Sequence, residues 1–144
     1  MEPRSFNVSF APHIHDGSSV PRIMWIVFAT LLPAAVVSVY AFGLDALRVL
    51  VVSTLACMSM EAFALVIMKR DPRLSLDGSA ALTGFLLGLT LPAGLSNGII
   101  IVGAFVAIIV AKQVFGGLGH NPFNPALTSR VFLLIAFPKQ LTTW

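Results

Sequence analysis

Long runs without a charged residue constrain the fold of this 144-residue chain more than any other feature. Residues 23–43 carry no charge over 21 positions, and residues 78–111 are uncharged over 34. Charged side chains make up 10% of the chain, against about a quarter in a soluble domain. A helix of about 20 apolar residues is long enough to cross a bilayer. The sequence therefore predicts an all-α membrane protein, a multi-pass bundle of transmembrane helices within the lipid bilayer.

The distribution of charge excludes a nucleic-acid-binding protein. The net charge of +3 and the pI near 9.6 would suggest a basic surface in a soluble domain. Here the charged residues are confined to short stretches between the apolar runs. No metal site is expected, because Cys57 is a single cysteine and a third ligand does not accompany His13 and His15.

Proline and glycine residues divide the apolar bundle, residues 23–144, into five segments. A polar tail, residues 1–22, precedes them and lacks the apolar core of a signal peptide. The predicted spans are residues 23–43, 49–68, 78–91, 99–115 and 126–137. The third and fifth have 14 and 12 residues, about 21 and 18 Å of helix, against a hydrocarbon core of roughly 30 Å. Such short, broken half-helices are typical of binding sites at membrane depth.

The distribution of lysine and arginine predicts the orientation. With the tail in the cytoplasm, six basic residues lie on that side and two on the other. Because cytoplasmic loops carry an excess of Lys and Arg, we expect the tail to be cytoplasmic and the location to be the cell inner membrane. The six are Arg4, Arg22, Lys69, Arg70, Arg73 and Lys112, and the two are Arg48 and Lys139.

Glu61 is the charged residue inside the second predicted span. Ser53, Cys57 and Glu61 recur every four residues and form a polar stripe that should face the bundle. A carboxylate at that depth costs about 2.5–3.5 kcal/mol on insertion scales, so it needs a partner or a function. Two interpretations stay open: an ion or proton contact, or a structural ion pair, for which Arg130 is a possible partner.

The loop before the last segment is the second candidate site. Asn124 is a good N-cap, and Pro125 suits the first helical position. The unpaired N–H groups of that first turn could hold a polar or anionic ligand. Alternatively, Asn124 only caps the helix, and Asn121 only closes a turn around Pro122.

Small residues at four-residue spacing predict close helix packing rather than a site. One set lies in the third segment and the other in the fourth: Ala80, Gly84 and Gly88, and Gly103, Ala107 and Ala111.

Four stretches of the chain resemble a known family. They are SFAPHIH at residues 9–15, SVPRIM at 19–24, DGSAALTGFLL at 77–87 and AKQVFGGLGHNPFNPAL at 111–127. They resemble the subunit designated D in the Rnf ion-translocating oxidoreductase complex, which is similar to the subunit designated B in the sodium-translocating NADH:quinone reductase. Members of that family are more than twice this long, so the resemblance implies that the chain corresponds to their N-terminal half.

The resemblance implies a membrane subunit of a translocase that carries electrons through flavins and is not catalytic alone. The complex transfers electrons between ferredoxin and NAD and couples this transfer to Na⁺ or H⁺ movement, together with other membrane and peripheral subunits. A non-covalent riboflavin is implied beside the Asn-x-x-Asn-Pro loop. Its implied contacts are Asn121 and Asn124, with Lys112, Gly116 and Gly117 as neighbours.

The flavin ring would also need apolar walls, which Phe123 and its neighbours Phe115 and Phe132 could supply. The family also attaches FMN covalently to a threonine in a Ser-x-Ala-Thr segment. That segment is absent from these residues, and Thr142 and Thr143 do not fit it. No FMN attachment residue is therefore assigned.

An aquaporin-like channel or transporter is the alternative function. Residues 120–128 contain Asn-Pro-Ala followed by Leu-Thr, a pattern that opens half-helices in such channels. A pore of this kind needs two matching half-helices, whereas the earlier short segment begins with Asp-Gly-Ser. A scaffold subunit without a cofactor is a third possibility.

Overall fold

The structure, a computed structural model, describes residues 19–143 and is helical in this part, without a strand. The two histidines of the tail, His13 and His15, lie outside the described residues, as do Arg4 and most of the tail. The described elements are α1 (Val20–Phe42), α2 (Leu44–Ile67), the 3-10 helix η1 (Pro72–Asp77), α3 (Ser79–Thr90), α4 (Asn97–Phe105), the π-helix η2 (Val106–Gln113), α5 (Pro125–Ala136) and α6 (Pro138–Thr142).

Helices α1 and α2 are joined by a sharp corner at Gly43. This glycine has a φ of 76°, a conformation that side chains rarely adopt, so the chain reverses within one residue. The predicted start of the second span at residue 49 is wrong, because α2 begins at Leu44. Asp45 and Arg48 do not interrupt the helix, since an acidic residue is favourable in a first helical turn. By length and composition alone, both helices are long and apolar enough to cross a membrane.

The α2 and α3 helices cross with their backbones in close contact. A Cβ on Gly84 would lie 2.6 Å from the carbonyl oxygen of Ser53, and one on Gly88 would lie 2.5 Å from Ser53 Oγ. Gly103 makes a similar close approach, to Leu133 of α5. The predicted packing role of these glycines is confirmed.

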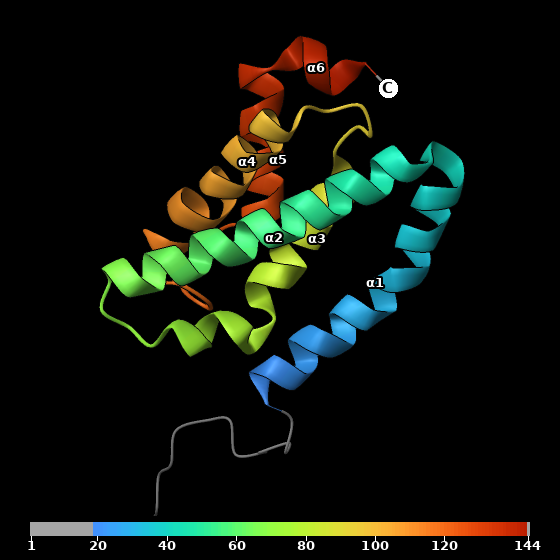
Figure 1. The fold of residues 1–144 in the computed structure, drawn as a ribbon. Coiled ribbons are helices and arrows are strands. Elements are labelled where there is room, and N and C mark those ends of the chain that lie inside the picture. The colour runs from blue at the N-terminus through green and yellow to red at the C-terminus, as the bar shows by residue number, and fades with distance from the viewer. Residues whose placement is uncertain (1–18, 144) are drawn as a thin grey trace, which may run out of the picture.

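The remaining helices lie on both sides of this crossing. Figure 1 shows α1 on one side of the α2–α3 pair and α4 and α5 on the other. The main apolar core joins α3, α4 and α5 through Leu87, Ile100 and Leu133, which are fully buried. By contrast, α1 contains no buried residue.

The elements alternate in direction, so their ends gather into two groups. At one end, Arg48 of α2 donates hydrogen bonds to the carbonyls of Ala93 and Leu95 in the loop between α3 and α4. At the other end, the last turns of α2 and η2 meet the first turns of α3 and α5. Helix α5 ends at Ala136, and Pro138 opens the short helix α6, because proline suits a first helical turn.

Candidate functional site

A buried ion pair links α2 to η2. Lys112 Nζ donates a hydrogen bond of 2.6 Å to Glu61 Oε1 and another of 2.6 Å to Ser79 Oγ. Lys112 is 2% exposed and Glu61 4%. Glu61 therefore faces the bundle, as its stripe with Ser53 and Cys57 predicts, and all three side chains are buried.

The structure corrects the partner considered for Glu61. Ser129, the neighbour of Arg130 on α5, is buried, and its hydroxyl donates to the Gly103 carbonyl at 2.6 Å. Neighbouring residues on a helix point about 100° apart, so Arg130 is directed away from that contact. Lys112 takes the place of Arg130 as the counterion of Glu61.

The π-helix explains how Lys112 reaches Glu61. The predicted fourth span, residues 99–115, is α-helical only to Phe105 and continues as η2. Its wider turns, closed by the Val114 N–H donating to the Ile109 carbonyl, present two consecutive side chains to one carboxylate. Gln113 Nε2 accordingly donates to the same Glu61 Oε1, at 3.0 Å. Short π-helical segments are frequent at functional sites.

Burial of Lys112 also changes the basis of the orientation prediction. Lys112 is one of the six basic residues that the sequence places on the cytoplasmic side, but its charge is paired inside the bundle rather than displayed on a loop. The bias that remains in the sequence is five against two, which still favours a cytoplasmic tail. The orientation itself stays a prediction.

A polar pocket of about 270 Å³ opens on one side of the ion pair. Glu61 and Gln113 line it, and so do Arg70 and Asp77. Within residues 19–143, neither Glu61 Oε2 nor Gln113 Oε1 has a hydrogen-bond partner, although both atoms are buried. A bound water or ion is one explanation for buried acceptors without donors. The remaining lining residues are Leu65, Gly116, Gly117, Leu118 and His120.

A second pocket, the asparagine pocket, has a volume of about 150 Å³ and lies beside the first turns of α3 and α5. It brings together Lys112, Ser79, Asn121 and Asn124, with apolar walls that include Leu82. Two helix N-termini and an ammonium group surround this space, which favours negative charge within it.

Both asparagines also have the structural roles considered for them. Asn124 Oδ1 accepts hydrogen bonds from the N–H groups of Ala126 at 3.0 Å and Leu127 at 3.4 Å, so it caps α5. Asn121 Nδ2 donates to the Phe123 carbonyl at 3.0 Å and closes the loop around Pro122. The other polar atoms, Asn124 Nδ2 and Asn121 Oδ1, make no hydrogen bond within the described chain. One donor and one acceptor therefore remain for a ligand.

The predicted site residues fall into three groups. Lys112, Asn121 and Asn124 share the asparagine pocket, whereas Gly116 and Gly117 line the polar pocket. Phe123 is 71% exposed and lines neither pocket, so it forms no wall within this chain.

Sequence reasoning misses two residues of the site, Ser79 and Gln113. Ser79 follows a glycine at the start of a half-helix, and Gln113 ends a long apolar run beside Lys112. A polar side chain at the boundary of an apolar run is the signal that could have indicated both.

The residues present fit the polar edge of a flavin ring. Asn121, Asn124 and Lys112 line the asparagine pocket, and their side chains carry amide donors, amide acceptors and an ammonium group. Its volume of about 150 Å³ is smaller than the roughly 300–1,000 Å³ of a typical small-molecule site. The pocket therefore accommodates the edge of such a ring and leaves the rest of the ligand to surfaces outside it.

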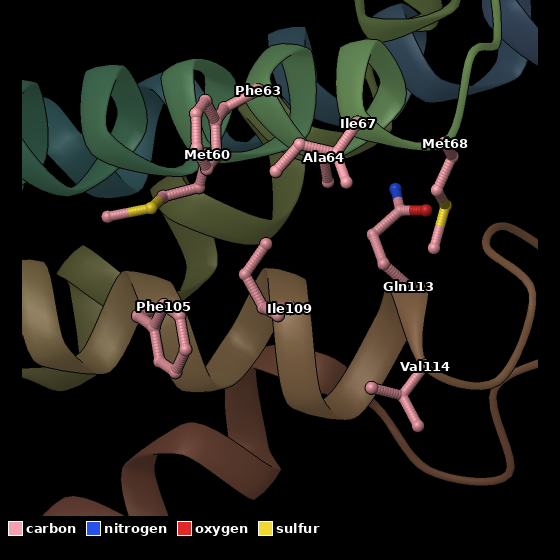
Figure 2. Close-up of a pocket in the computed structure, with 9 residues that line it drawn as sticks. All are labelled: Met60, Phe63, Ala64, Ile67, Met68, Phe105, Ile109, Gln113 and Val114. Carbon is pink, nitrogen blue, oxygen red and sulfur yellow. The ribbon is translucent and has the colours of Figure 1, made fainter.

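An apolar groove of about 370 Å³ separates the last turns of α2 from α4 and η2 (Figure 2). Gln113 is its one polar lining residue and lies at one end of the groove, near Met68. The same glutamine lines the polar pocket, so its amide separates an apolar surface from a polar interior. The apolar lining residues are Met60, Phe63, Ala64, Ile67, Met68, Phe105, Ile109 and Val114.

Comparison with known protein families shows which family the chain is related to. A sequence model described as the NQR2, RnfD, RnfE family matches residues 7–144. The chain belongs to this family. The loop that contains Asn121 and Asn124 and the buried Lys112–Glu61 pair both lie within the matched region.

Family relatives include subunits of ion-translocating complexes. The chain is 41% identical over 139 residues to the subunit designated D in the proton-translocating ferredoxin:NAD(+) oxidoreductase complex of Clostridium ljungdahlii, covering 96% of this chain and 42% of the relative. It is 46% identical over 127 residues to the subunit with the same designation in the ion-translocating oxidoreductase complex of Stutzerimonas stutzeri, covering 88% of this chain and 36% of the relative. The chain thus spans about two fifths of the length of these curated relatives.

Proposed function

We propose that this chain acts within a membrane subunit of an ion-translocating electron-transfer complex of the ferredoxin:NAD⁺ oxidoreductase class. In this proposal it binds riboflavin non-covalently at the asparagine pocket and contacts the transported Na⁺ or H⁺ at Glu61. The observation that carries the proposal is the buried Lys112–Glu61 pair, because it connects a pocket suited to a flavin edge with a pocket that holds unpaired oxygens. The relatives' names support the class of complex.

A location in the inner membrane is part of the proposal. Helices α1 and α2, of 23 and 24 residues, have the length and hydropathy of membrane spans. The absence of any buried residue in α1 supports contact with lipid or with partner subunits, since such an apolar helix is unstable in water. The remaining helices, at most 17 residues long, would complete a bundle with two half-helices.

Riboflavin would be held through this chain's own polar groups. Asn124 Nδ2 and Asn121 Oδ1 would bond the ring edge, and Lys112 would favour negative charge there. When bound, the flavin supplies one- and two-electron redox chemistry. Covalent FMN is not assigned to any residue of this chain.

Asn124→Asp tests the proposal in the assembled complex that contains the full-length subunit. Aspartate keeps the oxygen that caps α5 but replaces the amide donor with a second acceptor. We expect the complex to assemble with bound riboflavin reduced about tenfold, because an unpaired acceptor would face the ring. Extraction of non-covalent flavin, followed by chromatography, measures the loss.

Asn97→Asp is the matched control, because Asn97 opens α4 at the opposite end of the fold. That variant should keep its riboflavin. If Asn124→Asp assembles with a full complement of riboflavin, the flavin assignment is wrong.

The channel alternative has less support from the geometry. A pore between half-helices needs their N-termini to meet end to end, but α3 and α5 begin side by side at one pocket. The N-cap of α3 is Gly78 rather than an asparagine, so the second matching motif is missing. Water permeability without bound flavin would be the result that favours a channel.

A further inference from the structure

Lys112 is shared by the two pockets of the site. Its ammonium group touches Glu61, which lines the polar pocket, and Ser79, which lines the asparagine pocket. The lysine side chain itself also lines the asparagine pocket. Movement of this single charge would therefore change the electrostatic potential in both pockets.

The Glu61 side of the site contains two buried oxygen atoms that could bind a cation. Lys112 and Gln113 both donate to Glu61 Oε1, which leaves Glu61 Oε2 and Gln113 Oε1 buried and without a donor in the described part of the chain. Carboxylate and amide oxygens are the ligands that hard cations prefer. A carboxylate oxygen can equally accept a proton.

The charge balance allows one cation on Glu61 at a time. The pair of Glu61 and Lys112 is neutral and nearly fully buried. The two other fixed charges that line the polar pocket, Arg70 and Asp77, cancel each other. A free cation bound beside Lys112 would leave a net positive charge inside the protein, which is costly. That cost is avoided if the Lys112 ammonium group leaves Glu61 when the free cation binds there.

The asparagine pocket offers Lys112 a second position. Asn121 Oδ1 has no hydrogen-bond partner among the described residues, and an amide oxygen accepts readily from an ammonium group. The lysine stem has four carbons with rotatable bonds, so its ammonium group can take more than one position. Just beyond η2, the chain continues through Gly116 and Gly117, and glycine has the widest range of accessible backbone conformations.

We propose that Lys112 is a movable counterion. Its ammonium group neutralises Glu61 when no transported cation is bound, and it turns toward Asn121 when a free monovalent cation, Na⁺ or H⁺, takes its place on Glu61. Cation binding in the polar pocket thereby changes the charge in the asparagine pocket. This inference rests on the ion contact proposed above for Glu61.

Equilibrium cation binding to the purified complex tests the exchange. Na⁺ binding is measured by isothermal titration at fixed pH, and proton uptake is measured by pH titration without Na⁺, so that the two cations are distinguished. Lys112→Gln removes the competing charge, and we expect the Kd for the bound cation to fall about tenfold or more. Lys139→Gln removes an exposed lysine at the far end of the fold and should leave the Kd unchanged.

A second variant tests the same inference while keeping both residues of the ion pair. Asn121→Asp places a carboxylate in the asparagine pocket, where it would attract Lys112 away from Glu61. The Kd for the cation should again fall, whereas a purely structural ion pair predicts no change. If the Lys112→Gln complex fails to assemble, the Kd of the Asn121→Asp complex tests the inference in its place.

The two proposals fail in different ways. An unchanged Kd in an assembled Lys112→Gln or Asn121→Asp complex overturns the movable counterion and leaves the ion contact standing. Glu61→Gln should abolish the binding seen in the wild type. If it does not, the ion contact at Glu61 is wrong, and the exchange is wrong with it.

Discussion

The position of Lys112 shows how a single residue can differ from its expected environment. In the sequence, Lys112 ends an uncharged run of 34 residues, which is the usual place for a basic residue at a membrane surface. In the structure the same residue is 2% exposed. The reason is η2, whose wider turns direct Lys112 and Gln113 together toward Glu61. A π-helix has no simple sequence pattern, so this burial could not be predicted.

The position of Gly84 predicts the effect of adding one methyl group between α2 and α3. Its Cα lies against the α2 backbone, and a Cβ would come within 2.7 Å of Thr54 Cα, a backbone atom that cannot move aside alone. We expect Gly84→Ala to lower the stability of the assembled subunit by about 1–3 kcal/mol through overpacking. The thermal unfolding midpoint of the purified complex in detergent measures the effect.

Gly98 provides the comparison for that prediction. A Cβ on Gly98 would meet nothing within 4 Å, and the residue lies in the first turn of α4. Gly98→Ala should be neutral or slightly stabilising, because alanine loses less entropy on folding. Equal destabilisation by both substitutions would contradict the close α2–α3 contact.

Among the helices, those with clear end signals could be predicted well. The predicted spans 78–91 and 126–137 correspond to α3 (Ser79–Thr90) and α5 (Pro125–Ala136), because glycine or Asn-Pro marks their starts. The sequence misplaces the start of α2 because Asp45 and Arg48 resemble loop residues in an apolar sequence. Their charges instead have local roles at the end of the bundle, which only the folded chain reveals.

Arg48 gives a prediction about how the α3–α4 loop is held. Its Nη2 donates to the carbonyls of Ala93 at 3.0 Å and Leu95 at 3.1 Å, and Leu95 is buried. We expect Arg48→Lys to destabilise the subunit by about 0.5 kcal/mol and Arg48→Met by about 1 kcal/mol, because the partly buried carbonyls would lose their donors. Thermal unfolding in detergent tests the order of the two variants.

The neighbouring acidic residue serves as the control for Arg48. Asp45 lies 3.7 Å from Arg48 Nε, and its side chain is 70% exposed. Asp45→Asn should change stability by less than about 0.5 kcal/mol, since exposed ion pairs contribute little. A larger loss from Asp45→Asn than from Arg48→Met would contradict the role of the two carbonyls.

At the scale of the whole molecule, hydropathy predicts the class of fold but not the assembly of the site. The uncharged runs indicate helices, and the described chain is helical. The site depends on contacts between residues about 50 positions apart, such as Glu61 with Lys112 and Gln113. Periodicity shows that Glu61 faces the interior but does not show which helix lies opposite. The family resemblance indicates Lys112 and the asparagines as one group, and the structure adds Glu61 and Ser79 to it.

The orientation of the molecule in the membrane can be tested with cysteines introduced at its two ends, because the one native cysteine is buried. Cys57 is fully buried, so a membrane-impermeant maleimide should not label the wild type from either side. Arg22 lies in the first turn of α1, and Lys139 lies in α6; both are exposed, at opposite ends of the fold. With the tail in the cytoplasm, Lys139→Cys should be labelled in intact cells and Arg22→Cys only in inverted vesicles.

The same pair of variants also reports on the number of crossings. Labelling of both cysteines from the cytoplasmic side would mean that the chain between them crosses an even number of times. That result would exclude the arrangement in which α3 and α5 both extend from the Glu61 end toward the Arg48 end. Labelling of Arg22→Cys in intact cells and of Lys139→Cys in inverted vesicles would mean that the orientation is the reverse of the predicted one. The fold would stay the same, because the contacts of Gly84, Gly103 and Lys112 set the direction of each helix relative to its neighbours.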